Sequence, residues 1–244
     1  MLRLSNIGEF GYLILRIVTN LRYAWRDRKR VIRQLDLVGV RSIPLVLLIG
    51  IFAGAIIAWQ AAYQFKGMVS LSVLGGQVMR VVMMEMAPVL TALVISGRIG
   101  ASMTAEIGSM VISEQINALK TMAIDPVRYI AMPRVLGLTL MMPFLTLFSV
   151  IISVLGAFVV STYFLDITQQ VFFESIRDYF SVGDLLGGLF KGAVFGMIIS
   201  LVGCFKGLQT EGGASGLGAS TIASFVNSAV GILAGDFFLW IILF

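Results

Sequence analysis

The sequence predicts an all-α polytopic membrane protein with about five transmembrane helices, and three observations lead to this fold class. Hydrophobic residues make up 58% of the chain and charged residues only 13%, whereas about a quarter of residues are charged in soluble domains. The 244 residues contain several apolar stretches close to the roughly 20 residues that a spanning helix needs. Nine of the 18 basic residues lie within the first 41 positions. This bias predicts a cytoplasmic N-terminus, because Lys and Arg beside a span are retained on that side.

Residues 1–42 are expected to form an amphipathic region ahead of a transmembrane domain over 43–244. The apolar residues of this region follow one another at steps of three and four, the spacing of one helical face. They are Ile7, Phe10, Ile14, Ile17, Leu21 and Trp25. Because Arg16 and Arg22 fall on the other face, we expect one or two helices over 5–34 in the cytoplasmic interface. The spacing is unlike a signal peptide, and the apolar stripe disfavours a nucleic-acid-binding arm.

Five apolar stretches follow, and each is expected to cross the membrane. They are residues 43–63, 81–111, 134–163, 184–206 and 221–243. Pro44 suits a first helical turn, and Pro143 predicts a kink in the third span. The second stretch exceeds the roughly 30 Å core at about 1.5 Å per residue, so it predicts a long, kinked helix. Three connections are expected: 64–80, a loop or partly inserted segment; 164–183, an amphipathic outer segment; and 207–220, a glycine-rich loop.

The distribution of basic residues supports a topology with a cytoplasmic N-terminus and an outer C-terminus. Thirteen basic residues then fall inside, whereas three, Lys66, Arg80 and Arg177, fall outside.

Histidine is absent, which excludes imidazole metal sites, histidine triads and histidine proton relays. The single cysteine, Cys204, lies in an apolar run and is expected to be a small packing residue. We expect no metal and no catalytic residues. An intramembrane enzyme would need Ser–Lys or paired-carboxylate chemistry, and Glu85, Glu106 and Asp236 have no catalytic spacing.

Five ionisable residues fall within the predicted spans, where each costs roughly 2.5–3.5 kcal/mol at the bilayer centre. They are Glu85, Arg98, Glu106, Lys191 and Asp236. Both signs are present, so they could pair with one another, and internal pairing or a place near span ends is one interpretation. The other is a polar group in a cavity, which suits Glu85 and Lys191 because the topology places them at a similar depth. Met83 and Met84 lie beside Glu85, either as cavity lining or as ordinary core.

Span four carries glycines at positions 188, 192, 196, 203 and 207. Their spacing removes side chains from one helical stripe and lets another backbone approach. The sequence leaves open whether the partner helix belongs to the same chain or to a second copy.

The inner segment 112–133 predicts a capped helical elbow. Ser113 could cap a helix with Glu114 and Gln115 in its first turn. Asp125 and Pro126 predict a second cap, followed by a short helix to Met132, and Pro133 then opens span three. Such an elbow could dock a soluble partner or be an ordinary long loop.

The run from Glu85 to Arg134 resembles the signature of the MlaE/YrbE-type permeases, which are subunits of ABC transporters that move lipids with MCE-domain proteins. The matching elements are E-x-x-P-V at 85–89, G-R-x-G-A at 97–101, A-E-x-G at 105–108, E-Q-I-x-A-L at 114–119, Met122, Pro126, and P-R at 133–134. Weaker likeness extends along the chain, including K-x-x-x-F at 191–195 and L-x-x-D at 233–236. Asn117 departs from the family, which usually has aspartate there.

The resemblance implies a homodimer with an interfacial N-terminal helix and a cytoplasmic coupling helix. An ABC ATPase dimer, which binds the ATP, would dock on this coupling helix, and a periplasmic MCE-domain hexamer would sit on the opposite face; some systems add a STAS-domain protein. The docking residues would be Glu114, Gln115, Ile116, Leu119, Met122 and Pro126. The bound substrate would be a phospholipid in a cavity with Glu85, Lys191, Asp236, Met83 and Met84. The location implied is the bacterial inner membrane, with a role in outer-membrane lipid homeostasis.

A gradient-driven secondary transporter or channel subunit is the alternative function, with the buried charges as an ion path. Five spans give no even-numbered internal repeat of the kind common in such transporters, which disfavours it.

Overall fold

The computed structural model describes residues 4–65 and 71–243, and this part of the chain is helical with short connections and no strand. Five helical stretches are long and apolar enough to cross a membrane. They are 28–64, 74–112, 127–164, 182–208 and 213–243. The predicted fold class, an all-α polytopic membrane protein, is confirmed.

The N-terminal half contains α1 (Leu4–Asn20), α2 (Arg28–Val38), α3 (Ile43–Phe65), α4 (Leu74–Val81), α5 (Ala87–Ile95) and α6 (Ala101–Ile112). The C-terminal half contains α7 (Gln115–Thr121), α8 (Met132–Phe164), α9 (Gln169–Tyr179), α10 (Val182–Leu208) and α11 (Gly213–Leu243). Three single π turns, η4 (Val82–Met86), η5 (Ser96–Gly100) and η6 (Val127–Ala131), interrupt the long helices. Short 3₁₀ turns lie at η1 (Leu21–Tyr23), η2 (Val40–Ser42) and η3 (Leu71–Val73).

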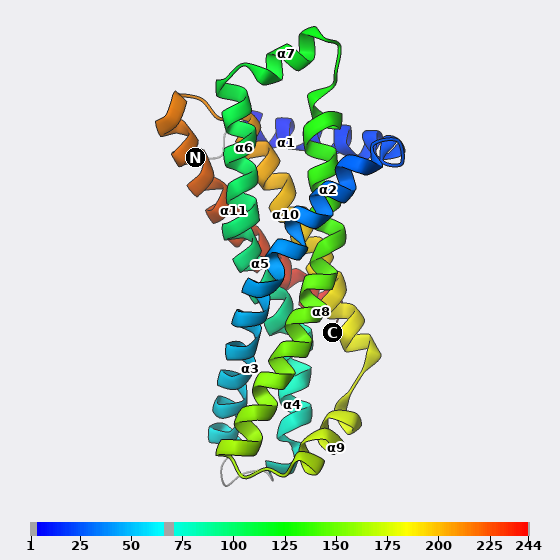
Figure 1. The fold of residues 1–244 in the computed structure, drawn as a ribbon, viewed down its shortest axis with the longest axis vertical. Helices are drawn as coiled ribbons and strands as arrows, with labels where there is room; N and C mark the ends of the chain where they lie inside the picture. The colour runs from blue at the N-terminus through cyan, green and yellow to red at the C-terminus, as the bar shows by residue number, and fades with distance from the viewer. Residues whose placement is uncertain (1–3, 66–70, 244) are drawn as a thin grey trace.

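The helices form an elongated bundle with α7 at one end and α9 at the other (Figure 1). Helix α8 packs along α3 on one side and α10 on the other, and α10 packs in turn on α11. Helix α1 lies across the bundle near the α7 end, and α2 leads obliquely from it into α3 (Figure 1). The two ends of the bundle are therefore built differently, one by α1 and α7 and one by α9.

Glycines bring the backbones of the spans into contact. A Cβ on Gly54 of α3 would collide with the backbone of Ser153 of α8, and one on Gly156 would collide with the Ile51 carbonyl. Ser153 Oγ also donates to the Gly50 carbonyl at 2.9 Å. The absence of side chains at these glycines thus allows α3 and α8 to pack closely and to form a hydrogen bond between helices.

The glycine stripe of α10 has its partners within the same chain. Gly188 lies against the Met83 carbonyl, Gly196 against Leu138 and Met142, and Gly207 against Ile107. The sequence left open whether these glycines pack on the same chain or on a second copy, and the structure places their contacts within the same chain.

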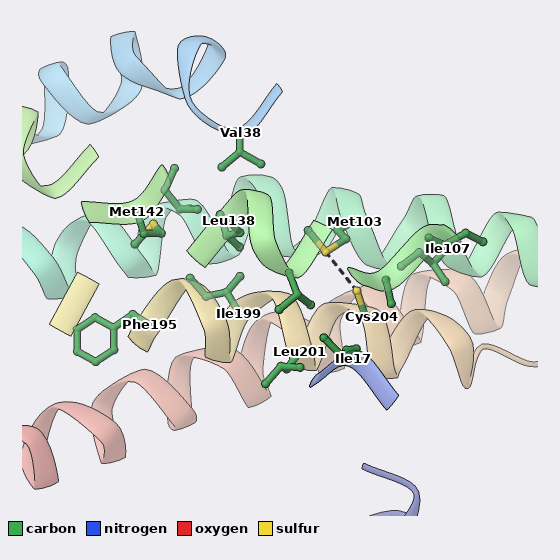
Figure 2. Close-up of a cluster of buried hydrophobic side chains, with 14 of the residues drawn as sticks. Ile17, Val38, Met103, Ile107, Leu138, Met142, Phe195, Ile199, Leu201 and Cys204 are labelled. Carbon is green, nitrogen blue, oxygen red and sulfur yellow. Dashed lines mark hydrogen bonds between the residues drawn. The ribbon is translucent and has the colours of Figure 1, made fainter. Parts of the chain in front are cut away.

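The main apolar core lies where α6, α8 and α10 meet, and α1 closes it (Figure 2). Cys204 is fully buried there, with its Sγ 3.8 Å from the Met103 Sδ (Figure 2). Cys204 is a small packing residue, as predicted.

Two predicted connections are shorter than expected. The second span begins at Leu74, so residues 74–80 belong to its helix, which favours the partly inserted segment over the outer loop for this part of 64–80. Residues 66–70 lie outside the described part. Helix α11 begins at Gly213, so the predicted glycine-rich loop over 207–220 is wrong and only 209–212 separate α10 from α11. Gly212 and Gly213, with φ of 82° and 67°, make the turn. Gly216 and Gly218 lie within α11 despite the low helix propensity of glycine.

Pro133 lies in the first turn of span three, as predicted, because α8 begins at Met132 and follows the π turn η6 without a gap. Pro133 has no N–H to donate to the carbonyl four residues earlier, and the wider turn accommodates this loss. Arg134 Nη1 donates to the Ile130 carbonyl at 3.1 Å, so this carbonyl is satisfied inside the turn.

Candidate functional site

A triad of charged side chains lies inside the bundle. Lys191 Nζ of α10 is 2.7 Å from Glu85 Oε1 and 2.9 Å from Asp236 Oδ1 of α11. The Lys191 side chain has 0% exposure, whereas those of Glu85 and Asp236 are 28% and 19% exposed. The ammonium is enclosed by protein, and the two carboxylates are the accessible members of this charge triad.

The backbone around the charge triad explains how three separate helices reach one point. Glu85 lies in the π turn η4, and such turns re-aim side chains and are frequent at functional sites. Lys191 stands between Gly188 and Gly192, which pack against the Met83 carbonyl and the Thr146 side chain. These glycines let α10 approach its neighbours closely enough for Lys191 to reach both carboxylates.

The charge triad has one positive and two negative groups. In an interior of low dielectric, each charge of an ion pair is stabilised by the opposite charge. Removing one partner of a buried pair costs about 3–5 kcal/mol. The partly exposed carboxylates can accept hydrogen bonds from hydroxyl or ammonium groups of a ligand. Met83 is buried and Met84 half-buried beside them, which gives an adaptable apolar border.

Structure and sequence agree on the depth of Glu85 and Lys191, which the topology predicted to be similar. Arg98 and Glu106, the other predicted intramembrane polar residues, do not join the charge triad. Arg134 Nη2 lies 3.0 Å from Glu106 Oε2, and Arg98 Nη1 donates to Ser42 Oγ at 2.7 Å.

The inner elbow is an ordered hairpin at one end of the bundle (Figure 1). Ile116 is buried and Leu119 is partly buried against the main core. Glu114, Gln115 and Met122 are exposed, with Met122 at 61%. An anchored underside with an exposed upper surface is what a docking element needs.

The predicted Ser113 cap is wrong. Helix α6 runs to Ile112, and the Ser113 hydroxyl donates to the Ser109 carbonyl at 2.7 Å in its last turn. Helix α7 therefore begins at Gln115 after Glu114, whose φ of 58° makes the turn. Asn117, the departure from the family pattern, donates to the Glu114 carboxylate.

Sequence reasoning missed the connection between the elbow and the N-terminal region. Asp125 Oδ1 lies 2.6 Å from Arg16 Nη2 and also accepts from the Val127 N–H at 2.9 Å; this second bond is the predicted cap. Asp27 pairs with Arg128 at 3.0 Å. Asp27 is an acidic residue within a basic segment, and this departure in charge could have indicated an ion pair.

The predicted apolar stripe of the N-terminal region is partly buried against the bundle and partly exposed. Ile17 is buried, and Phe10 packs edge-on against Phe205 at 5.2 Å. Trp25, after α1, is 81% exposed. The side chain of Ile7 lies outside the described part. A second apolar face of α1, with Tyr12, Leu15 and Val18, is exposed and suits contact with lipid.

Five apolar helical stretches that enclose internal ion pairs define a multi-pass membrane protein. The chain belongs to the MlaE permease family, whose model matches residues 31–242. It is 37% identical over 213 residues to a probable ABC transporter permease protein, slr1045, of Synechocystis sp., covering 87% of this chain and 81% of the relative. It is also 37% identical over 233 residues to the probable ABC transporter permease protein RC0129 of Rickettsia conorii, covering 96% and 90%. The protein TRIGALACTOSYLDIACYLGLYCEROL 1, chloroplastic, of Arabidopsis thaliana is 33% identical over 229 residues, covering 94% and 64%.

The predicted family is confirmed, and the chain is an ABC transporter permease subunit. Membership implies a partner ATPase and a second permease copy. The family indicates a transport subunit.

Proposed function

We propose that this permease subunit moves phospholipids between the bacterial inner membrane and an MCE-domain partner, and so contributes to outer-membrane lipid homeostasis. The charge triad carries the proposal, because it places two partly exposed carboxylates on apolar spans. An amphipathic substrate needs an apolar chamber with a few polar groups for its headgroup. The name of the Arabidopsis relative contains that of a glycolipid, which supports a lipid substrate.

The chamber is proposed to form where two copies meet along α11. Only 11% of the residues in the most apolar stretch of α11 are buried, against 50% in α10. Asp236 lies on this helix, and Phe225, Leu233 and Phe237 are among its exposed residues. A second copy over α11 would cover this surface and enclose the Glu85 and Asp236 carboxylates, while Met83 and Met84 would border the acyl chains.

The motor is proposed to be a cytoplasmic ABC ATPase dimer that binds the ATP. Its docking surface would be the elbow, with Glu114, Gln115 and Met122 exposed above the anchored Ile116 and Leu119; Pro126 would complete it. The chain carries no nucleotide-binding signature of its own. A periplasmic MCE hexamer would sit at the α9 end, and a STAS-domain protein would bind the ATPase.

The proposed orientation has a cytoplasmic N-terminus and a periplasmic C-terminus. The basic N-terminal segment and the elbow then share the cytoplasmic side, where anionic lipid attracts Lys and Arg.

The test is ATP-dependent transfer of a labelled phospholipid from proteoliposomes that hold the permease and its ATPase to the MCE partner. We expect Asp236→Asn to slow transfer with little change in assembly, because it removes one carboxylate of the charge triad and keeps its shape. Asp36→Asn, which changes an exposed aspartate of α2, is the matched control. Unchanged transfer by the Asp236 variant would contradict the role of the charge triad. Gradient-driven flux by the chain alone would instead support the secondary transporter.

A further inference from the structure

A second polar site lies on the elbow side of the bundle, away from the charge triad. A cavity of about 220 Å³ opens between α2, η5, α6 and the start of α8. Its polar lining residues are Gln34, Arg41, Arg98, Ser102, Glu106 and Arg134. Arg98 lies 13 positions beyond Glu85 on the same long helix, which is roughly 20 Å at about 1.5 Å per residue. The two sites are therefore distinct.

The cavity has a surplus of positive charge. It contains three guanidinium groups and one carboxylate, and the carboxylate of Glu106 is taken up by Arg134 at 3.0 Å. Within residues 4–65 and 71–243, no carboxylate lies within 4 Å of the guanidinium nitrogens of Arg41 or Arg98. Two arginines therefore face this space without an acidic partner.

The geometry holds one of these arginines ready for a ligand. Arg98 emerges from the π turn η5, and its Nη1 donates to Ser42 Oγ at 2.7 Å. Ser42 in turn donates to the Val38 carbonyl, which fixes the hydroxyl as an acceptor for Arg98. A guanidinium positioned in this way binds phosphate through parallel hydrogen bonds.

The cavity lies where a span enters the apolar layer. Arg41 and Ser42 directly precede α3, whose apolar run starts at Ile43. This is the level of lipid headgroups on the side of the basic N-terminal segment. The volume is smaller than the roughly 300–1,000 Å³ of pockets that enclose a whole ligand, so it suits a headgroup phosphate whose acyl chains stay outside.

We propose that this cavity binds the phosphate group of a phospholipid from the cytoplasmic leaflet, with Arg41 and Arg98 as its ligands. The inference rests on the charge and geometry of the cavity and is independent of the transport proposal. Unchanged transfer by the Asp236 variant, together with lipid binding at this cavity, would contradict only the proposed role of the charge triad.

The experiment is native mass spectrometry of the full chain in detergent, titrated with phosphatidylglycerol. We expect Arg98→Gln and Arg41→Gln to weaken one lipid-binding event by roughly tenfold or more, as for loss of a hydrogen bond to a charged group. Arg33→Gln is the matched control, because Arg33 is an exposed arginine of α2 outside the cavity. Diacylglycerol, which has acyl chains but no phosphate, should bind equally to all four proteins.

Three results would overturn the proposal. The first is equal phosphatidylglycerol binding by the wild type and both cavity variants. The second is diacylglycerol binding that depends on Arg41 or Arg98. The third is displacement of the lipid by inorganic phosphate at equal concentration, which would identify a soluble phosphate as the ligand. If Arg98→Gln fails to fold, the phosphatidylglycerol affinity of Arg41→Gln tests the proposal, because Arg41 is exposed.

Discussion

Lys191 Nζ lies 2.7 Å from Glu85 Oε1 although 106 positions separate the two residues. The contact joins α10 to the π turn η4, and Asp236 on α11 completes it from the other side. The lysine thus has a structural task, which is to hold two partly exposed carboxylates beside its buried ammonium.

Replacing Lys191 with Met should strongly destabilise the protein. Two carboxylates would remain close together without a counter-charge, and breaking a buried pair in this way costs about 3–5 kcal/mol. Thermal unfolding of the purified protein in detergent measures the effect. Lys206→Met, at the other end of α10, is the control and should melt like the wild type. Adding Glu85→Gln and Asp236→Asn to the Lys191 variant should restore most of the lost stability, and failure of this rescue would contradict the electrostatic explanation.

Gly54→Leu should force α3 and α8 apart. A Cβ at this position already collides with the Ser153 backbone, and overpacking typically costs about 1–3 kcal/mol or more. The expected result is a lower melting temperature and poor yield. Gly8→Ala on α1 serves for comparison, since a Cβ there meets nothing within 4 Å. A Gly54 variant as stable as the Gly8 variant would show that this helix contact is not tight.

Asp27→Asn should loosen the N-terminal region from the elbow with little effect on global stability. It removes the ion pairs with Arg128 and Arg30, and such partly exposed pairs contribute about 0–1 kcal/mol each. Hydrogen exchange should therefore rise locally, near residues 27–30 and 123–129, while the melting temperature stays nearly unchanged. Asp36→Asn changes an exposed aspartate of α2 and should leave exchange at the elbow as it is. A uniform rise over the whole chain would argue against a local tie.

Glu114→Lys should weaken binding of the partner ATPase several-fold. The change reverses the charge of an exposed elbow residue without disturbing the buried Ile116, and charge reversal at an interface opposes association. Co-purification of the ATPase with the tagged permease measures the loss. Glu174→Lys, on α9 at the opposite end (Figure 1), should retain the ATPase. Equal recovery with both variants would place the docking surface elsewhere.

Much of the architecture could be predicted from local patterns. Run lengths of apolar residues predicted five spans, and steps of three and four predicted the helix α1. The nine basic residues among the first 41 positions predicted a cytoplasmic N-terminal segment. The motif from Glu85 to Arg134 predicted the family, which the match over residues 31–242 confirmed. These signals are visible in the sequence because hydrophobic burial and helical periodicity involve residues close together in the chain.

Only the tertiary structure decided how the polar residues are grouped. Each of the three π turns carries a charged residue, Glu85, Arg98 or Arg128. No local sequence pattern predicted these turns. The Asp125–Arg16 pair joins positions 109 apart, and Ser113 completes one helix rather than starting the next. Ion pairs and backbone contacts of this kind depend on which surfaces meet when the helices pack. The sequence determined the helices and their membrane character, and packing determined which charges neutralise one another and which, at Arg41 and Arg98, stay available for a ligand.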